Sequence, residues 1–186
     1  MKKYFVLLLL FFFVKNNYAQ SWKKLAGDTI IWSANYQLLK EDFKGKPKGK
    51  NAGLTEAVIY FYPKENSGTM KFVVEAIFVK SKSFLRGDSK YVMQHEQLHF
   101  DITEVNARRL RKRIMEKDFT KVKNISEVIQ SFFNKTNAEW NHEQMMYDKD
   151  TEHGMNPAKQ DIWNAKVAAE LKELDAFATT EIDIRK

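Results

Sequence analysis

The chain has 186 residues, a formal net charge of +7 and 44% hydrophobic residues, a composition that favours one folded domain with its own core over a disordered or fibrous protein. It contains no cysteine, which excludes disulfide bonds, thiolate metal ligands and lipid attachment at a cleavage site. Any metal bound by this chain must therefore be held by histidine, carboxylate and water.

The N-terminus predicts export. A basic start is followed by an uncharged apolar run over residues 4–14 and by Ala19, a small residue. This order is typical of a secretory signal peptide, and the run is shorter than the roughly 20 residues that span a bilayer. We predict a signal peptide at 1–19 and a single domain at 20–186, in a periplasmic or secreted protein with no stable membrane insertion. An uncleaved membrane anchor is the alternative.

The first part of the mature chain predicts strands. Three segments are rich in β-branched and aromatic residues, and a charged loop with Gly and Pro and a short turn separate them. We expect strands at 28–32, 55–62 and 69–79, the loop at 42–50 and the turn at 64–68. The second strand should stop at Pro63 and pair with the third as an antiparallel hairpin.

The remainder predicts helices. Asp88 can cap a helix over 89–115, which no Gly or Pro interrupts. A second helix is expected over 126–146, and a third runs from an Asn156-Pro157 start to about residue 178. Strands followed by helices, without repeats, predict one α+β domain.

A basic cluster at 108–113 lies on the first predicted helix. In another context such a cluster would favour nucleic-acid binding, but this chain is predicted to be exported. Removing residues 1–19 also lowers the formal charge from +7 to +4. We therefore expect a solvated helix face, with cations near the C-terminal end of the helix dipole, and no nucleic-acid partner.

The stretch His95-Glu96-Gln97-Leu98-His99 lies on the same predicted helix. Residues four apart share one helix face, so both imidazoles can bind one metal ion, with Glu96 at about 100° beside them. This spacing predicts a Zn²⁺ site at which Glu96 acts as general base. The alternative is two ordinary surface histidines, which leaves the position of the glutamate unexplained.

The third metal ligand must come from another part of the chain. Helical geometry places Glu104 at about 180° and Asp101 at about −120° from His95, so neither can reach the site. We predict His153, which lies in a loop between helices and can fold back over a helix face. The alternatives to His153 are Asp148, Asp150 and His142. Tyr147 could donate its phenol to a developing oxyanion or could only pack.

Three blocks of the sequence resemble a known family. The blocks are residues 32–38 with 41–45, residues 95–102 with a continuation at 107–108, and a C-terminal set of Tyr147, Asp148, Thr151, His153, Gly154, Gln160 and Trp163. Together they are similar to exported bacterial proteins that are classified only as a domain of unknown function. Members of this family are predicted to be Zn-dependent proteases of the zincin type. The resemblance extends from about residue 32 to residue 171.

The resemblance implies a zincin-like fold, in which a small antiparallel sheet packs on a long active-site helix and the C-terminal half is helical. An edge strand of that sheet would lie along the cleft and pair with an extended peptide. We expect the strand at 69–79 to be this edge. The alternative is simple pairing of that strand with 55–62 while helices bury the other face.

The expected function is that of an exported, monomeric zinc peptidase acting on a peptide or protein substrate. His95, His99 and His153 would bind Zn²⁺, Glu96 would be the general base, and Tyr147 could help to stabilise the oxyanion. The alternative is an exported metal- or partner-binding domain whose zincin site is inactive. Substrate preference depends on loop positions and is not predicted.

Overall fold

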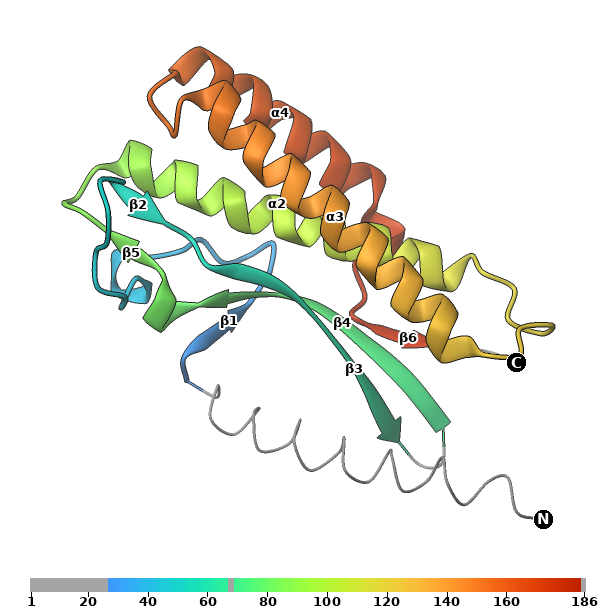
Figure 1. Ribbon diagram of the computed structural model, residues 1–186. Coiled ribbons are helices and arrows are strands. Elements are labelled where there is room, and N and C mark those ends of the chain that lie inside the picture. Colours follow the sequence, from blue (N-terminus) through green and yellow to red (C-terminus); the bar gives the residue numbers. More distant parts are fainter. Residues whose placement is uncertain (1–26, 67–68, 185–186) are drawn as a thin grey trace.

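Figure 1 shows the computed structural model, which describes residues 27–66 and 69–184. Three α-helices in this part of the chain lie on one side of a twisted antiparallel sheet (Figure 1). The expectation of a mixed fold with strands before helices is confirmed, although a short last strand follows the helices. The predicted signal peptide at 1–19 lies outside the described residues.

The main sheet has four strands: β1 (Thr29–Ile31), β3 (Ala57–Asn66), β4 (Thr69–Val79) and β6 (Glu181–Asp183). β4 is central, because β3 pairs with one side of it and β1 and β6 pair with the other. The expectation that 69–79 forms the sheet edge is therefore wrong. The alternative, a hairpin between β3 and β4, is confirmed, and β3 forms one edge of the described sheet.

β3 also continues through Pro63, where the sequence predicts an end. Proline has no N–H to donate, so it interrupts a central strand but is tolerated on an edge strand. A second sheet consists only of β2 (Gly53–Leu54) and β5 (Phe84–Leu85). These strands, like β6, are too short to produce a recognisable alternation in the sequence.

α2 (Lys90–Met115) begins one residue later than predicted, and so does its cap. The side chain of Ser89 accepts a hydrogen bond from the Val92 N–H and caps the helix. The expectation that Asp88 is the cap is wrong, and Asp88 forms an ion pair with Lys40 instead.

The two later helices differ from expectation at their C-terminal ends. α3 (Ile125–Thr151) extends beyond the predicted 126–146, so Tyr147 and Asp148 lie on a helix. α4 (Pro157–Glu173) begins as predicted, with Asn156 as cap and proline in the first turn. It ends at Glu173, before the predicted residue 178, and a short 3-10 turn, η3 (Asp175–Phe177), follows.

α2 is buried on two sides, which positions the stretch from His95 to His99. One side packs on the sheet through an apolar core that includes Phe78 and Phe100, whose ring centroids are 5.8 Å apart. The other side packs against α3 and α4 through Ile102, Tyr147 and Trp163. The helix is therefore held between the sheet and the helical layer (Figure 1).

The basic cluster at 108–113 is not a solvated face, and this expectation is wrong. Arg111 is completely buried and Arg108 is nearly so, and both donate to the Glu104 carboxylate at 2.9 Å. Arg111 also donates to the backbone oxygens of Val74 and Phe177. The two arginines therefore compensate a buried carboxylate and join α2 to the sheet and to the C-terminal segment. As predicted, Glu104 faces away from the histidines.

Within residues 27–66 and 69–184, no helix has both the length and the apolar character needed to cross a membrane.

Candidate metal centre

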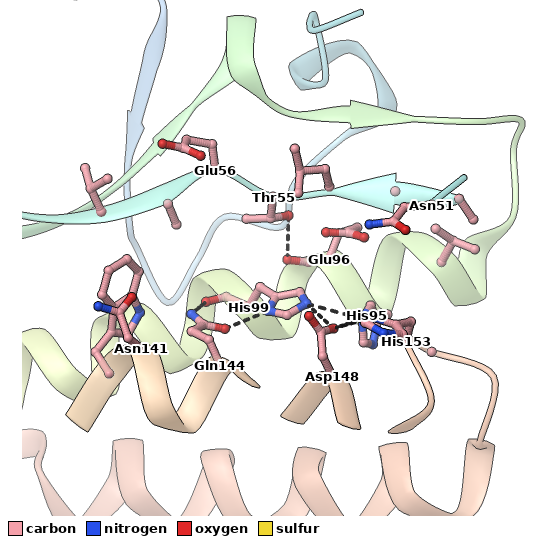
Figure 2. A pocket seen from close by; sticks show the side chains of 18 residues that line it. Asn51, Thr55, Glu56, His95, Glu96, His99, Asn141, Gln144, Asp148 and His153 are labelled. Atoms are coloured by element: carbon pink, nitrogen blue, oxygen red, sulfur yellow. Dashed lines mark hydrogen bonds and ion pairs between the residues drawn. The ribbon is translucent and has the colours of Figure 1, made fainter. Parts of the chain in front are cut away.

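His95 and His99 lie in the N-terminal half of α2, at one wall of a cleft of about 460 Å³. The cleft is bordered by α2, α3, the chain segment 51–58 and the turn after α3 (Figure 2). His95 is only 3% exposed, and His99 is partly buried. The motif histidines therefore face a sheltered space that is still open to solvent on one side.

Three potential ligand atoms meet in this cleft. The Nε2 atoms of His95 and His99 are 3.2 Å apart, and they lie 3.2 Å and 3.1 Å from Oδ1 of Asp148 on α3. In the described part of the chain, this is the one cluster of histidine and carboxylate side chains close enough to hold a metal ion. The expectation that the two histidines share one helix face is confirmed, and Asp148 is the residue brought to them.

The charges of this cluster favour a cation at its centre. Burial disfavours a charged imidazole, yet the hydrogen bond to Asp148 raises the pKa of His99 above its usual value. Burial alone would raise the pKa of Asp148, but hydrogen bonds from His95 and His99 hold that pKa well below its usual range. The cluster therefore stabilises positive charge between the two rings and the carboxylate.

A glutamine lies behind each imidazole. His99 Nδ1 donates to Oε1 of Gln144 at 2.6 Å, and His95 Nδ1 donates to Oε1 of Gln160 at 3.1 Å. The sequence assigns neither glutamine a role in the site, although Gln160 belongs to the block that resembles a family. Gln144 precedes Asp148 by four residues on α3, so it can be recognised once Asp148 is placed on that helix face.

Glu96 lies beside the histidines, packed against β2. A Cβ atom at Gly53 would lie 2.4 Å from Oε1 of Glu96, so only glycine leaves room for the carboxylate in this position. Glu96 is 4% exposed, and its Oε2 has no hydrogen-bond partner among the described residues. Burial raises the pKa of this carboxyl group and makes the carboxylate a stronger base than an exposed glutamate.

His153 lies in the loop after α3, as predicted, and the loop folds back over the site. Its side chain is 69% exposed, and its Nδ1 is 3.6 Å from Oδ1 of Asp148. The next residue, Gly154, touches the His95 ring so closely that a Cβ there would lie 3.1 Å from the ring. Metal binding by His153 remains a prediction, and Asp148 lies closer to both α2 histidines.

Tyr147 lies behind the His95 ring rather than at the cleft. The two ring centroids are 4.6 Å apart in a stacked arrangement, and the phenol donates to Oε1 of Gln160 at 2.7 Å. Tyr147 is fully buried and is not among the residues that line the cleft. Burial also raises the pKa of its hydroxyl, which keeps the phenol neutral. Of the two roles left open by the sequence, these contacts favour packing.

The remaining alternatives for the third ligand lie outside the cluster. His142 is exposed on α3, as the sequence indicates for a surface histidine. Asp150 accepts a hydrogen bond from the indole of Trp163 at 3.1 Å and supports α4. Neither residue is part of the group formed by His95, His99 and Asp148.

Comparison with known proteins gives one match. A family model described as a bacterial protein of unknown function (DUF922) matches residues 22–154. Searches of curated proteins and of solved structures gave no significant match. The matched segment includes the His95-Glu96-Gln97-Leu98-His99 stretch, Asp148 and His153, and it ends before α4.

Proposed function

This chain belongs to that bacterial family of unknown function, and we propose that it is an exported zinc-dependent peptidase. One observation carries the proposal. His95 Nε2, His99 Nε2 and Asp148 Oδ1 lie 3.1–3.2 Å from one another, and Glu96 lies beside them. This combination supplies a metal site and a buried base in one cleft.

The donor set fits zinc. In a tetrahedral zinc site with bonds of about 2.0–2.1 Å, neighbouring ligand atoms are about 3.3 Å apart, close to the spacings of 3.1 and 3.2 Å found here. Two imidazole lone pairs and a carboxylate oxygen at this spacing repel one another unless a cation or proton lies between them. We assign Asp148 as the third ligand and His153 to the rim of the cleft.

Glu96 supports hydrolysis over simple metal storage. Its buried Oε2 has no partner among the described side chains, so a water molecule or a substrate group is needed to satisfy it. Zinc bound at the cluster would lower the pKa of a water molecule and polarise the carbonyl of the scissile bond. Glu96 would accept the proton of the attacking water and pass it to the leaving amine.

We also propose zincin-like packing of the sheet on the active-site helix. The segment 51–58, which leads into the edge strand β3, lines the cleft opposite α2 (Figure 2). The backbone of such an edge can pair with an extended peptide, which places the peptide across the histidines. β3 replaces β4 as the strand proposed for this role, because β4 is paired on both sides.

The test compares the mature protein, residues 20–186, with its Glu96→Gln variant on unstructured protein substrates, with zinc and iron quantified in both. Iron is included because two histidines and one carboxylate also bind Fe(II) in oxygenases. We expect one zinc per chain in both proteins and cleavage by the wild type only. If both bind zinc and the wild type cleaves no faster than the variant, the protein is a metal-binding domain with an inactive site.

A further inference from the structure

We propose that Gln144 and Gln160 are positioning residues that fix the proton of each imidazole on Nδ1 and direct both Nε2 lone pairs at one point. This inference rests on the proposed metal site, and it explains how a chain without cysteine orients two histidines so that both offer Nε2 to one metal ion. Neither glutamine would touch the metal or the substrate, since each contacts the far side of an imidazole ring.

The orientation of Gln144 is determined by its other contacts. Its amide nitrogen donates to the backbone oxygen of His99 at 2.9 Å and to Oγ1 of Thr103 at 3.2 Å. A backbone oxygen can only accept, so the amide NH₂ must face it and the amide oxygen must face the ring. His99 Nδ1, at 2.6 Å from that oxygen, must then carry the proton.

Gln160 acts in the same way on His95. Its amide nitrogen donates to Oδ1 of Asn164 at 3.0 Å, which leaves Oε1 to accept from Tyr147 and from His95 Nδ1. Gln160 is 2% exposed, so water does not compete for this oxygen. The buried Tyr147 phenol thus holds Gln160, and Gln160 holds His95.

A neutral imidazole has a single N–H, so a proton fixed on Nδ1 leaves Nε2 as a metal-binding lone pair. A carboxylate could accept the same hydrogen bond, but the cleft already contains the carboxylates of Glu56, Glu96 and Asp148. A neutral amide orients the ring without adding another negative charge to a partly buried site. The choice of glutamine over an acidic residue follows from this charge balance.

The role of Gln160 makes α4 a part of the metal centre. This helix lies beyond the segment that matches the family model, which ends at residue 154. His99 is held by Gln144 on α3, the helix that also carries Asp148. Each imidazole is therefore oriented by a different helix of the helical layer.

The test uses zinc-loaded mature protein with ¹⁵N-labelled histidine, studied by NMR, because zinc then takes the place of a proton between the two rings and Asp148. We expect both rings in the Nδ1–H form. This measurement needs no variant and does not depend on peptidase activity. Finding His95 or His99 in the Nε2–H form would overturn the assignment of its glutamine.

Variants then separate positioning from structure. In the zinc-loaded protein, Gln144→Leu should speed solvent exchange of the Nδ1 proton of His99 only, Gln160→Leu should do so for His95 only, and each should weaken zinc binding by about 10- to 100-fold. Gln144→Glu and Gln160→Glu keep the acceptor and should keep the proton on Nδ1. Gln130→Leu, on an exposed part of α3, is the matched control and should change neither quantity. Leucine variants with unchanged exchange of the Nδ1 protons and unchanged zinc affinity would refute the inference, whatever the peptidase assay gives.

Discussion

Gly53 determines where the Glu96 carboxylate can lie, because the two groups are in direct contact. We expect Gly53→Ala to displace the carboxylate and to lower kcat by about 100-fold, since a shift of about 1 Å can cost that much. Zinc content should not change, because Gly53 contacts no proposed ligand. Ala52→Ser, at the exposed neighbouring position, is the control. A Gly53→Ala enzyme with normal kcat would show that Glu96 does not depend on this contact.

Single substitutions also distinguish the two candidates for the third metal ligand. Asp148 lies 3.1 and 3.2 Å from the imidazoles, whereas His153 is largely exposed. We expect Asp148→Ala to weaken zinc binding by at least about 100-fold and His153→Ala to change it less than about threefold, as measured by competition with a chromophoric chelator. The reverse order would support His153, the ligand predicted from the sequence.

At the scale of elements, the α2 motif could be predicted and its partners could not. The histidine spacing is a local property of one helix, and the expected shared face is what the structure shows. Asp148 is 53 residues from His95 and reaches it only because α3 packs along α2 and continues past residue 146. The burial of Arg111 depends equally on distant groups, including the backbone oxygen of Val74.

The stability contributed by the short turn η1 (Lys40–Asp42) should depend on pH through Asp42. Burial opposes charge on Asp42, but hydrogen bonds from the Leu39 N–H, the Tyr36 hydroxyl and Lys80 lower its pKa. A carboxyl with a lowered folded-state pKa stabilises the protein above its unfolded pKa of about 3.9, and the contribution disappears as pH falls through the lower folded value.

We therefore expect Asp42→Asn to lower the free energy of unfolding by about 1–3 kcal/mol at pH 7 and by clearly less below about pH 3. Urea unfolding of both proteins at the two pH values measures the difference. Glu41→Gln, at the exposed position beside it, is the control. An equal loss of stability at both pH values would mean that the ionised carboxylate is not what stabilises the turn.

The Arg111–Glu104 pair stabilises the junction of α2 with the sheet and the C-terminal segment. Replacing Arg111 by Leu leaves a buried carboxylate short of one partner and removes the donor to three backbone oxygens. We expect a loss of about 3–5 kcal/mol in the free energy of unfolding. Lys117→Gln, at an exposed position just after α2, is the control and should change it by less than about 0.5 kcal/mol. A small effect of Arg111→Leu would show that the network is not structurally important.

At the scale of the whole molecule, the proposed centre depends on every layer of the fold. The sheet and its extension over 51–58 supply one wall of the cleft, α2 supplies the motif, α3 supplies Asp148, and α4 supports His95 through Gln160 (Figures 1 and 2). Such a centre requires the assembled fold, so metal binding should be lost when the protein is unfolded.

The most direct measurement is the location of the metal in crystals of the mature protein grown with one equivalent of zinc. Anomalous diffraction recorded on both sides of the zinc absorption edge identifies the element and its position. We predict a single strong peak within bonding distance of His95 Nε2, His99 Nε2 and the Asp148 carboxylate. A cleft without a peak, or zinc bound only elsewhere on the protein, would contradict the proposed zinc centre.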